Sequence, residues 1–246
     1  MTTFKKRPLC SLRFASAGTY EENLSYLCSL IERTPDDAVV IAPEVCLTNF
    51  DYDHFEEAAD FASTALESLS PLSQSRIIVL TVIERRAEGI YNVAKVLHGN
   101  EVVHEQAKAR LFKFGGEHEY FAEGCDEEIV LFEVDGLKMG IMICFELRFK
   151  ALWQKLEGAD IIAVPAQWGI LRSEHFVTLT EALAVMNQCY VVASDSANPE
   201  MTGQSGIISP FGEVRRNGNI PCLEGLYDEK EVQKMRRYLD VGINAR

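Results

Sequence analysis

Short apolar runs alternate along the chain with segments whose apolar residues recur every three or four positions. Residues 38–43 and 77–83 are almost wholly apolar and have the length of a buried strand. Residues 20–33 and 55–69 instead place their apolar side chains on one face of a helix. This alternation predicts a layered α/β fold, with sheet inside and helices outside.

The same alternation continues to the end of the chain. Further strands are expected at residues 8–15, 91–97, 101–106, 137–143, 161–164 and 190–194, with a strand pair around the turn at Asp135-Gly136. Further helices are expected at residues 145–156, 173–187 and 229–238. No repeat, linker or low-complexity tract interrupts the pattern, so residues 1–246 are predicted to form one domain.

Composition narrows the possible partners. The formal net charge of −13 argues against nucleic acid and against anionic membranes, because phosphate binding needs a basic face. Seven scattered cysteines without a C-x-x-C pair predict neither a disulfide framework nor a zinc site, which favours a reducing cytoplasm. No apolar run is long enough to span a bilayer, and no signal-peptide pattern begins the chain.

Cys144 lies where an apolar run ends and the expected helix from residue 145 begins. A thiol at such a corner is close to the positive end of the helix macrodipole and to free backbone N–H groups, which would favour the thiolate and hold an oxyanion. Glu146 and Arg148 add charge at this strand end, where α/β proteins collect ligands. Cys144 is therefore a candidate nucleophile, and the alternative is a small buried hydrophobe.

Two further reactive side chains follow expected strands. Glu44 comes directly after Pro43, which ends a strand ladder, and Lys108 follows the run at 101–106. With Cys144, they supply a base for the thiol, a cation for an oxyanion and a nucleophile for a carbonyl carbon. The trio therefore fits acyl transfer, although a single charge of this kind is more often simply solvated at the start of a loop.

The residues around this trio resemble the motifs of the nitrilase superfamily of carbon-nitrogen hydrolases, over essentially the full chain. The matching motifs are Pro43-Glu44, Lys108-Ala-Arg-Leu-Phe112 and Cys144-Phe-Glu-Leu-Arg-Phe149. Glu117 falls on the family's structural glutamate. Later segments that also resemble the family are Trp168, Arg172 and His175, and the segment at residues 203–212.

This resemblance implies a four-layer α-β-β-α sandwich, with subunits that pair through helices into a homodimer or a higher homo-oligomer. It also implies that Glu44 is the general base and that Cys144 is acylated. Lys108 and the Phe145 backbone N–H would hold the oxyanion, and Glu117 would order Lys108. No metal or organic cofactor is implied, and the expected partner is a small-molecule amide.

Within the superfamily, the compact length and the residues Thr48-x-Phe50 resemble the aliphatic amidase and ω-amidase-like branch. The expected substrate is therefore the amide of a short acid, such as an ω-amide of a dicarboxylate. One alternative is an N-carbamoyl amino acid, as for β-ureidopropionases. The alternatives from other classes are a Cys144–His175 dyad hydrolase and a catalytically idle binding or scaffold protein.

The residues expected around the acyl pocket have two interpretations each. Arg148 either pairs with Glu146, which we favour, or joins Arg172 in orienting a substrate carboxylate. Trp168 either forms a wall of the pocket or belongs to the core. His118 and His175 are interpreted as hydrogen-bonded scaffold residues.

One segment departs from the branch. Leu183-Ala-Val-Met-Asn187 stands where relatives of this branch carry Arg-Ala-x-Glu-Asn. Because residues 183 and 186 are three apart, they are expected to share a helix face. The hypothesis is that hydrophobic packing has replaced a buried ion pair, and the alternative is that Met186 lies on an exposed face.

Overall fold

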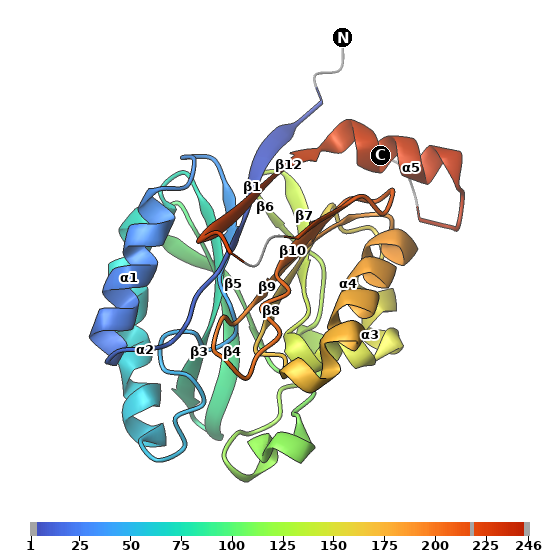
Figure 1. The fold of residues 1–246 in the computed structure, drawn as a ribbon. Coiled ribbons are helices and arrows are strands. Elements are labelled where there is room, and N and C mark those ends of the chain that lie inside the picture. Colours follow the sequence, from blue (N-terminus) through green and yellow to red (C-terminus); the bar gives the residue numbers. More distant parts are fainter. Residues whose placement is uncertain (1–3, 217–218, 244–246) are drawn as a thin grey trace.

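The computed structural model describes residues 4–216 and 219–243, and within them it shows two six-stranded sheets packed face to face between layers of helices (Figure 1). Helices α1 (Tyr20–Glu32) and α2 (Phe55–Leu69) cover the outer face of the first sheet. Helices α3 (Lys150–Lys155) and α4 (Ser173–Asn187) cover the outer face of the second. The expected four-layer α-β-β-α sandwich is confirmed.

The first sheet brings two strand ends to one edge. Its order is β12 (Cys222–Asp228), β1 (Lys6–Leu12), β2 (Val39–Ile41), β3 (Ile77–Arg86), β4 (Gly89–His98) and β5 (Glu101–Ala107). Strands β2 and β3 are parallel, and β4 is antiparallel to both β3 and β5. Strands β2 and β5 therefore run in the same direction, so the residues that follow them lie at the same edge.

The second sheet contains three neighbouring parallel strands. Its order is β11 (Val214–Arg216), β10 (Gly206–Ile208), β9 (Tyr190–Asp195), β8 (Ile161–Ala166), β7 (Leu137–Ile141) and β6 (Phe132–Val134). Strands β7, β8 and β9 are parallel, whereas the outer pairs are antiparallel. The segments that follow β7, β8 and β9 consequently share one edge.

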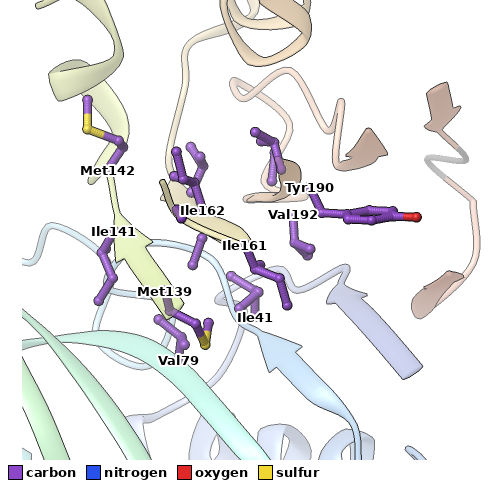
Figure 2. Close-up of a cluster of buried hydrophobic side chains, with 14 of the residues drawn as sticks. Ile41, Val79, Met139, Ile141, Met142, Ile161, Ile162, Tyr190 and Val192 are labelled. Carbon is purple, nitrogen blue, oxygen red and sulfur yellow. The ribbon is translucent and has the colours of Figure 1, made fainter. Parts of the chain in front are cut away.

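The main core lies between the sheets, where Ile41 and Val79 of the first sheet face Met139 and Ile141 of the second (Figure 2). Side chains alternate along each strand, so Val40 points the other way, into a second core under α1 and α2. Buried hydroxyls also join the sheets. Ser11 Oγ donates to the Ala193 carbonyl and Ser194 Oγ donates to the Leu12 carbonyl, each at 2.7 Å.

Most of the expected elements are confirmed, and three helices have the expected bounds: α2, α4 and α5 (Glu229–Tyr238). The helix expected at residues 145–156 is wrong in its first half. Residues Cys144–Arg148 form a 3-10 turn, and Phe149 is extended at φ −108° and ψ 91°, so that α3 begins only at Lys150. The Glu146 carboxylate accepts from the backbone N–H of Ile143, the residue just before this turn, which favours a tight loop over a continuous helix.

The hypothesis about α4 is wrong. Leu183 is fully buried, but Met186 is 65% exposed. Residues three apart on a helix differ by about 60° around its axis, and here the edge of the buried stripe falls between them. The apolar residue at 186 therefore does not fill the place of a buried charge within the subunit.

None of the helices in the described ranges is long and apolar enough to cross a membrane.

Candidate active site

Glu44 lies just after β2, at the edge of the first sheet where β2 and β5 both end, and its side chain is fully buried. Oε1 accepts hydrogen bonds from Lys108 Nζ at 2.7 Å and from Asn92 Nδ2 at 2.8 Å, and Oε2 accepts one from the Gln167 backbone N–H at 3.1 Å. Burial raises the pKa of Glu44, and Lys108 opposes this rise. The carboxyl group is thus held in a fixed position with a raised affinity for a proton.

Lys108 follows β5 and is also fully buried. Its ammonium donates to Glu44 and, at 2.8 Å, to Oε1 of Glu117. Burial alone would lower the pKa of Lys108, but the two carboxylates raise it above its usual value. Lys108 therefore stays charged, and because an ammonium has three N–H groups, one remains for a substrate.

Glu117 connects Lys108 to the loop that follows it. While Oε1 accepts from Lys108, Oε2 accepts from the Phe112 backbone N–H at 2.9 Å. The glutamate begins a short 3-10 turn, Glu117–Glu119, and is 5% exposed. We call Glu44, Lys108, Glu117 and Cys144 the buried cluster.

Cys144 completes the buried cluster from the second sheet. Its backbone lies in the left-handed region at φ +48°, which is unfavourable for a residue with a Cβ. The thiol donates a hydrogen bond to Glu44, and burial, followed by the charge of Glu44, raises the pKa of Cys144 well above its usual value. The expected thiolate at a helix start is therefore wrong, because the turn is a single 3-10 segment and the thiol faces a buried carboxylate.

A small cavity of about 30 Å³ opens beside the thiol. It is lined by Phe112, Glu117, Cys144, Phe145, Arg148, Gln167, Trp168 and Arg172. Trp168 is 3% exposed, its backbone N–H donates to Asp195 Oδ1 at 2.7 Å, and its indole N–H donates to the Arg172 carbonyl at 2.9 Å. Trp168 is thus a fixed wall of the cavity as well as part of the core.

Two of the lining residues are arginines, Arg148 and Arg172, which we call the pocket rim. The Arg148 guanidinium is 5.0 Å from the centre of the Trp168 ring, and the Arg172 guanidinium is 4.9 Å from the centre of the Phe112 ring. Among residues 4–216 and 219–243, neither guanidinium forms an ion pair with a carboxylate. Aromatic faces hold the two charges without neutralising them.

The favoured ion pair between Arg148 and Glu146 is wrong. Arg148 Nη2 lies 2.9 Å from His175 Nδ1, whereas the fully buried Glu146 accepts two backbone N–H bonds. His175 is exposed and contacts Arg148, as expected of a scaffold residue, and His118 is exposed. Because the thiol of Cys144 bonds Glu44, the geometry does not support a Cys144–His175 dyad.

Sequence reasoning missed two amides that hold Glu44. Asn92 is a buried polar residue in the middle of β4, and Gln167 follows β8 at the same edge as the other site residues. The Gln167 side chain also donates to the Glu44 carbonyl at 3.0 Å. A lone asparagine in an apolar strand was a usable signal, because buried amides need partners.

The cluster brings together a thiol, a carboxylate and an ammonium, and a set of groups of this kind can catalyse acyl transfer. No group of three or more possible metal ligands was found among the described residues. The thiol, carboxylate and ammonium of the buried cluster are suited to covalent catalysis by the thiol.

Comparisons with known proteins agree with this chemistry. The family model described as carbon-nitrogen hydrolase matches residues 16–218. The chain is 31% identical over 236 residues to a 2-oxoglutaramate amidase of Bacillus subtilis (strain 168), covering 89% of this chain and 90% of that protein. It is 32% identical over 249 residues to a deaminated glutathione amidase of Escherichia coli O157:H7, covering 95% of each.

The fold agrees as well. The crystal structure of Saccharomyces cerevisiae Nit3, a member of branch 10 of the nitrilase superfamily, matches with a TM-score of 0.86 and 21% identity, over 98% of this chain and 97% of that one. The motif resemblance, the family model and the two relatives agree. The chain belongs to the carbon-nitrogen hydrolase family.

Proposed function

We propose that this protein hydrolyses the terminal amide of a short dicarboxylic ω-amide, releasing ammonia and the dicarboxylate, with Cys144 as the nucleophile. The observation that carries the proposal is that Glu117 and Cys144 of the buried cluster line the same cavity as two guanidinium groups without carboxylate partners. Similarity to a 2-oxoglutaramate amidase and to an omega-amidase of Yersinia enterocolitica supports the choice of substrate.

In the first half-reaction, the thiol of Cys144 attacks the amide carbon while its proton passes to Glu44. The tetrahedral oxyanion forms between the free N–H of Lys108 and the backbone N–H of Phe145. The oxyanion then collapses, the C–N bond breaks, and the departing nitrogen takes the proton from Glu44 and leaves as ammonia. Burial raises the pKa of Glu44, which makes its carboxylate a stronger base for the proton of the thiol.

In the second half-reaction, water replaces ammonia. Glu44 accepts a proton from the water as its oxygen attacks the thioester carbon. The same two donors, Lys108 and Phe145, stabilise the second oxyanion. Breakage of the C–S bond then releases the carboxylic acid, and Cys144 regains its proton from Glu44. Because Glu117 fixes the ammonium of Lys108, the donor is in place before charge develops.

The pocket rim supports a substrate with a distal carboxylate. A net charge of −13 repels anions, so recognition of an acid requires local positive charge. Arg148 and Arg172 supply two such charges in the lining of the cavity. A guanidinium binds a carboxylate through two parallel N–H bonds, which also fixes its orientation.

The proposal also covers the oligomeric state of the protein and its location in the cell. We propose a homodimer, or a higher homo-oligomer, formed through the outer helices, and the exposed side chains of Val185, Met186 and Tyr238 on α4 and α5 support it. Light scattering after gel filtration tests it. We also propose that residues 1–246 act as one domain in the cytoplasm, in keeping with seven unpaired cysteines.

Matched pairs of substrates test the function. Glutaramate and 2-oxoglutaramate should release ammonia faster than butyramide, which has the same amide but no carboxylate. N-carbamoyl-β-alanine tests the carbamoyl alternative, since its hydrolysis also yields carbon dioxide, and nitriles test a different branch of chemistry. Faster turnover of butyramide than of every acid would remove the carboxylate part of the proposal, and no ammonia from any amide would remove the proposal itself.

A further inference from the structure

Glu146 is a buried carboxylate that no step of the proposed reaction uses. It has no solvent exposure, and its Oε1 accepts from the Ala109 backbone N–H at 2.7 Å. Its Oε2 accepts from the Ile143 backbone N–H, also at 2.7 Å. Ala109 is the residue after Lys108, and Ile143 is the residue before Cys144. One carboxylate therefore connects the segments that carry the oxyanion donor and the nucleophile, which come from different sheets.

The same residue closes the turn that holds Cys144 in its unfavourable conformation. The Glu146 backbone N–H donates to the Ile143 carbonyl at 3.0 Å, while its side chain binds the Ile143 N–H. A residue with a Cβ at φ +48° persists only where surrounding contacts hold it. Both polar groups of the Ile143 backbone are thus fixed by Glu146, on the residue directly before the strained cysteine.

We propose that Glu146 is a positioning residue that sets the separation between Lys108 and Cys144. A carboxyl group at this length of side chain offers one oxygen to each of the two N–H groups. Because a misplacement of about 1 Å in a catalytic group costs about 100-fold in rate, loosening either bond should slow the acylation of Cys144. The substrate would still bind, because its contacts are made by the pocket rim.

Two variants test the length of the Glu146 side chain and its charge separately. Glu146→Gln keeps the length but replaces one acceptor oxygen by an NH₂ group, which cannot accept from a backbone N–H. Glu146→Asp keeps both acceptors but is one methylene too short to reach both partners. We expect each variant to lower kcat about 30-fold or more, with KM changed less than threefold. The inference rests on the proposed function only where turnover is the readout.

Alkylation of Cys144 by iodoacetamide provides a readout that needs no substrate. We expect the rate constant for modification of Cys144, followed by peptide mass spectrometry, to fall about tenfold or more in both variants. The matched control is Thr180→Val, which removes a buried hydroxyl bonded to the Phe176 carbonyl in α4. It lowers stability away from the cluster, so at equal distance below its Tm it should retain the kcat and alkylation rate of the wild type.

The outcomes are distinct. Wild-type kcat and alkylation in either folded variant, or losses no larger than in Thr180→Val, would overturn the positioning role. If neither variant folds, hydrogen exchange in the wild type decides, because the Ala109 and Ile143 amides should be protected and exchange at loop rates would refute both bonds. If the wild type hydrolyses no amide but alkylation still falls in the variants, the proposed function fails while the positioning role stands.

Discussion

The buried cluster and the pocket rim differ in how their charges are compensated. In the buried cluster, Lys108 contacts two carboxylates at 2.7 and 2.8 Å, and every charge is removed from solvent. At the pocket rim, Arg148 and Arg172 rest on aromatic faces and have no carboxylate partner among the described residues. The charges of the buried cluster therefore hold one another in place, whereas the charges of the pocket rim are available to a ligand.

The distinction between the buried cluster and the pocket rim would fail if the nucleophile were a residue other than Cys144. Cys144→Ala should lower kcat on the order of 10⁴-fold or more, because the covalent route is lost entirely. An electrophilic acyl donor should add its mass to the wild-type peptide that contains Cys144 and to no peptide of the variant. An adduct on Cys46, Cys125 or Cys189 would show that the buried cluster is not the reacting centre.

A change of shape at constant charge tests the buried cluster next. Lys108→Arg should lower kcat about 100-fold or more, because the planar guanidinium cannot replace a compact ammonium between Glu44 and Glu117 and still offer an N–H to the oxyanion. Steady-state ammonia release measures the effect, and Arg33→Lys, a change on the exposed surface, is the control. Near-normal turnover in Lys108→Arg would make the residue peripheral.

Asp195 is fully buried and accepts the backbone N–H of Trp168 at 2.7 Å, and it should make the stability of the protein depend on pH. Burial raises the pKa of Asp195 to about 7, against the opposition of backbone N–H bonds from Trp168 and Gly203. The folded protein then keeps a proton that the unfolded chain releases near pH 4, so this contribution is complete at low pH and is lost as pH rises to about 7. We expect a loss of about 4 kcal/mol in the free energy of unfolding over that interval, because each unit of difference in pKa between the folded and unfolded states contributes about 1.4 kcal/mol.

Asp195→Asn should remove that part of the pH dependence. The variant loses hydrogen bonds as well, so the informative quantity is the slope of the unfolding free energy between pH 4 and 7 and not its level at one pH. Urea unfolding at each pH gives this slope. An identical slope in Asp195→Asn and in the wild type would mean that Asp195 is ionised throughout.

The pocket rim should be more tolerant than the cluster. Arg148→Gln and Arg172→Gln should each raise KM for ω-amide acids about tenfold, which is the effect of one charged hydrogen bond, with little change for butyramide. The ratio of kcat/KM for glutaramate to that for butyramide isolates the effect, and Arg33→Gln is the matched control. If the two substrates lose activity equally, the arginines act on structure and not on the carboxylate.

The residues of the site differ in how well the sequence alone could predict them. Glu44, Lys108 and Cys144 were predictable as a group because each follows a strand, and strands running in one direction bring their ends to one edge. The raised pKa of Cys144 was not, because it follows from burial against Glu44, whereas the sequence shows only a local corner. Local sequence therefore predicts which groups meet better than it predicts their protonation.

The pairing of strands that are far apart in the sequence and the direction of long side chains were also not predictable from the sequence. Strand β12 was missed because its residues include a glycine and alternate only in part, and its pairing is with β1, more than 200 residues away. The partner of Arg148 was assigned wrongly because Glu146 is close in sequence but turns inward to two backbone N–H groups. A long side chain selects its partner in three dimensions, which spacing along the chain does not specify.

The smallest expected effect concerns helix α4, outside both regions. Because Met186 is 65% exposed, Met186→Glu should change the free energy of unfolding of the isolated subunit by less than about 0.5 kcal/mol. In the proposed homodimer the same change places a charge on an outer helix face, so dissociation should increase while the dilute subunit keeps its stability. Chemical unfolding at low concentration and light scattering at high concentration separate the two effects. A loss of about 3 kcal/mol in a variant whose assembly is unchanged would mean that residue 186 is buried within the subunit, and hydrophobic replacement of an ion pair would again explain the departure from the branch.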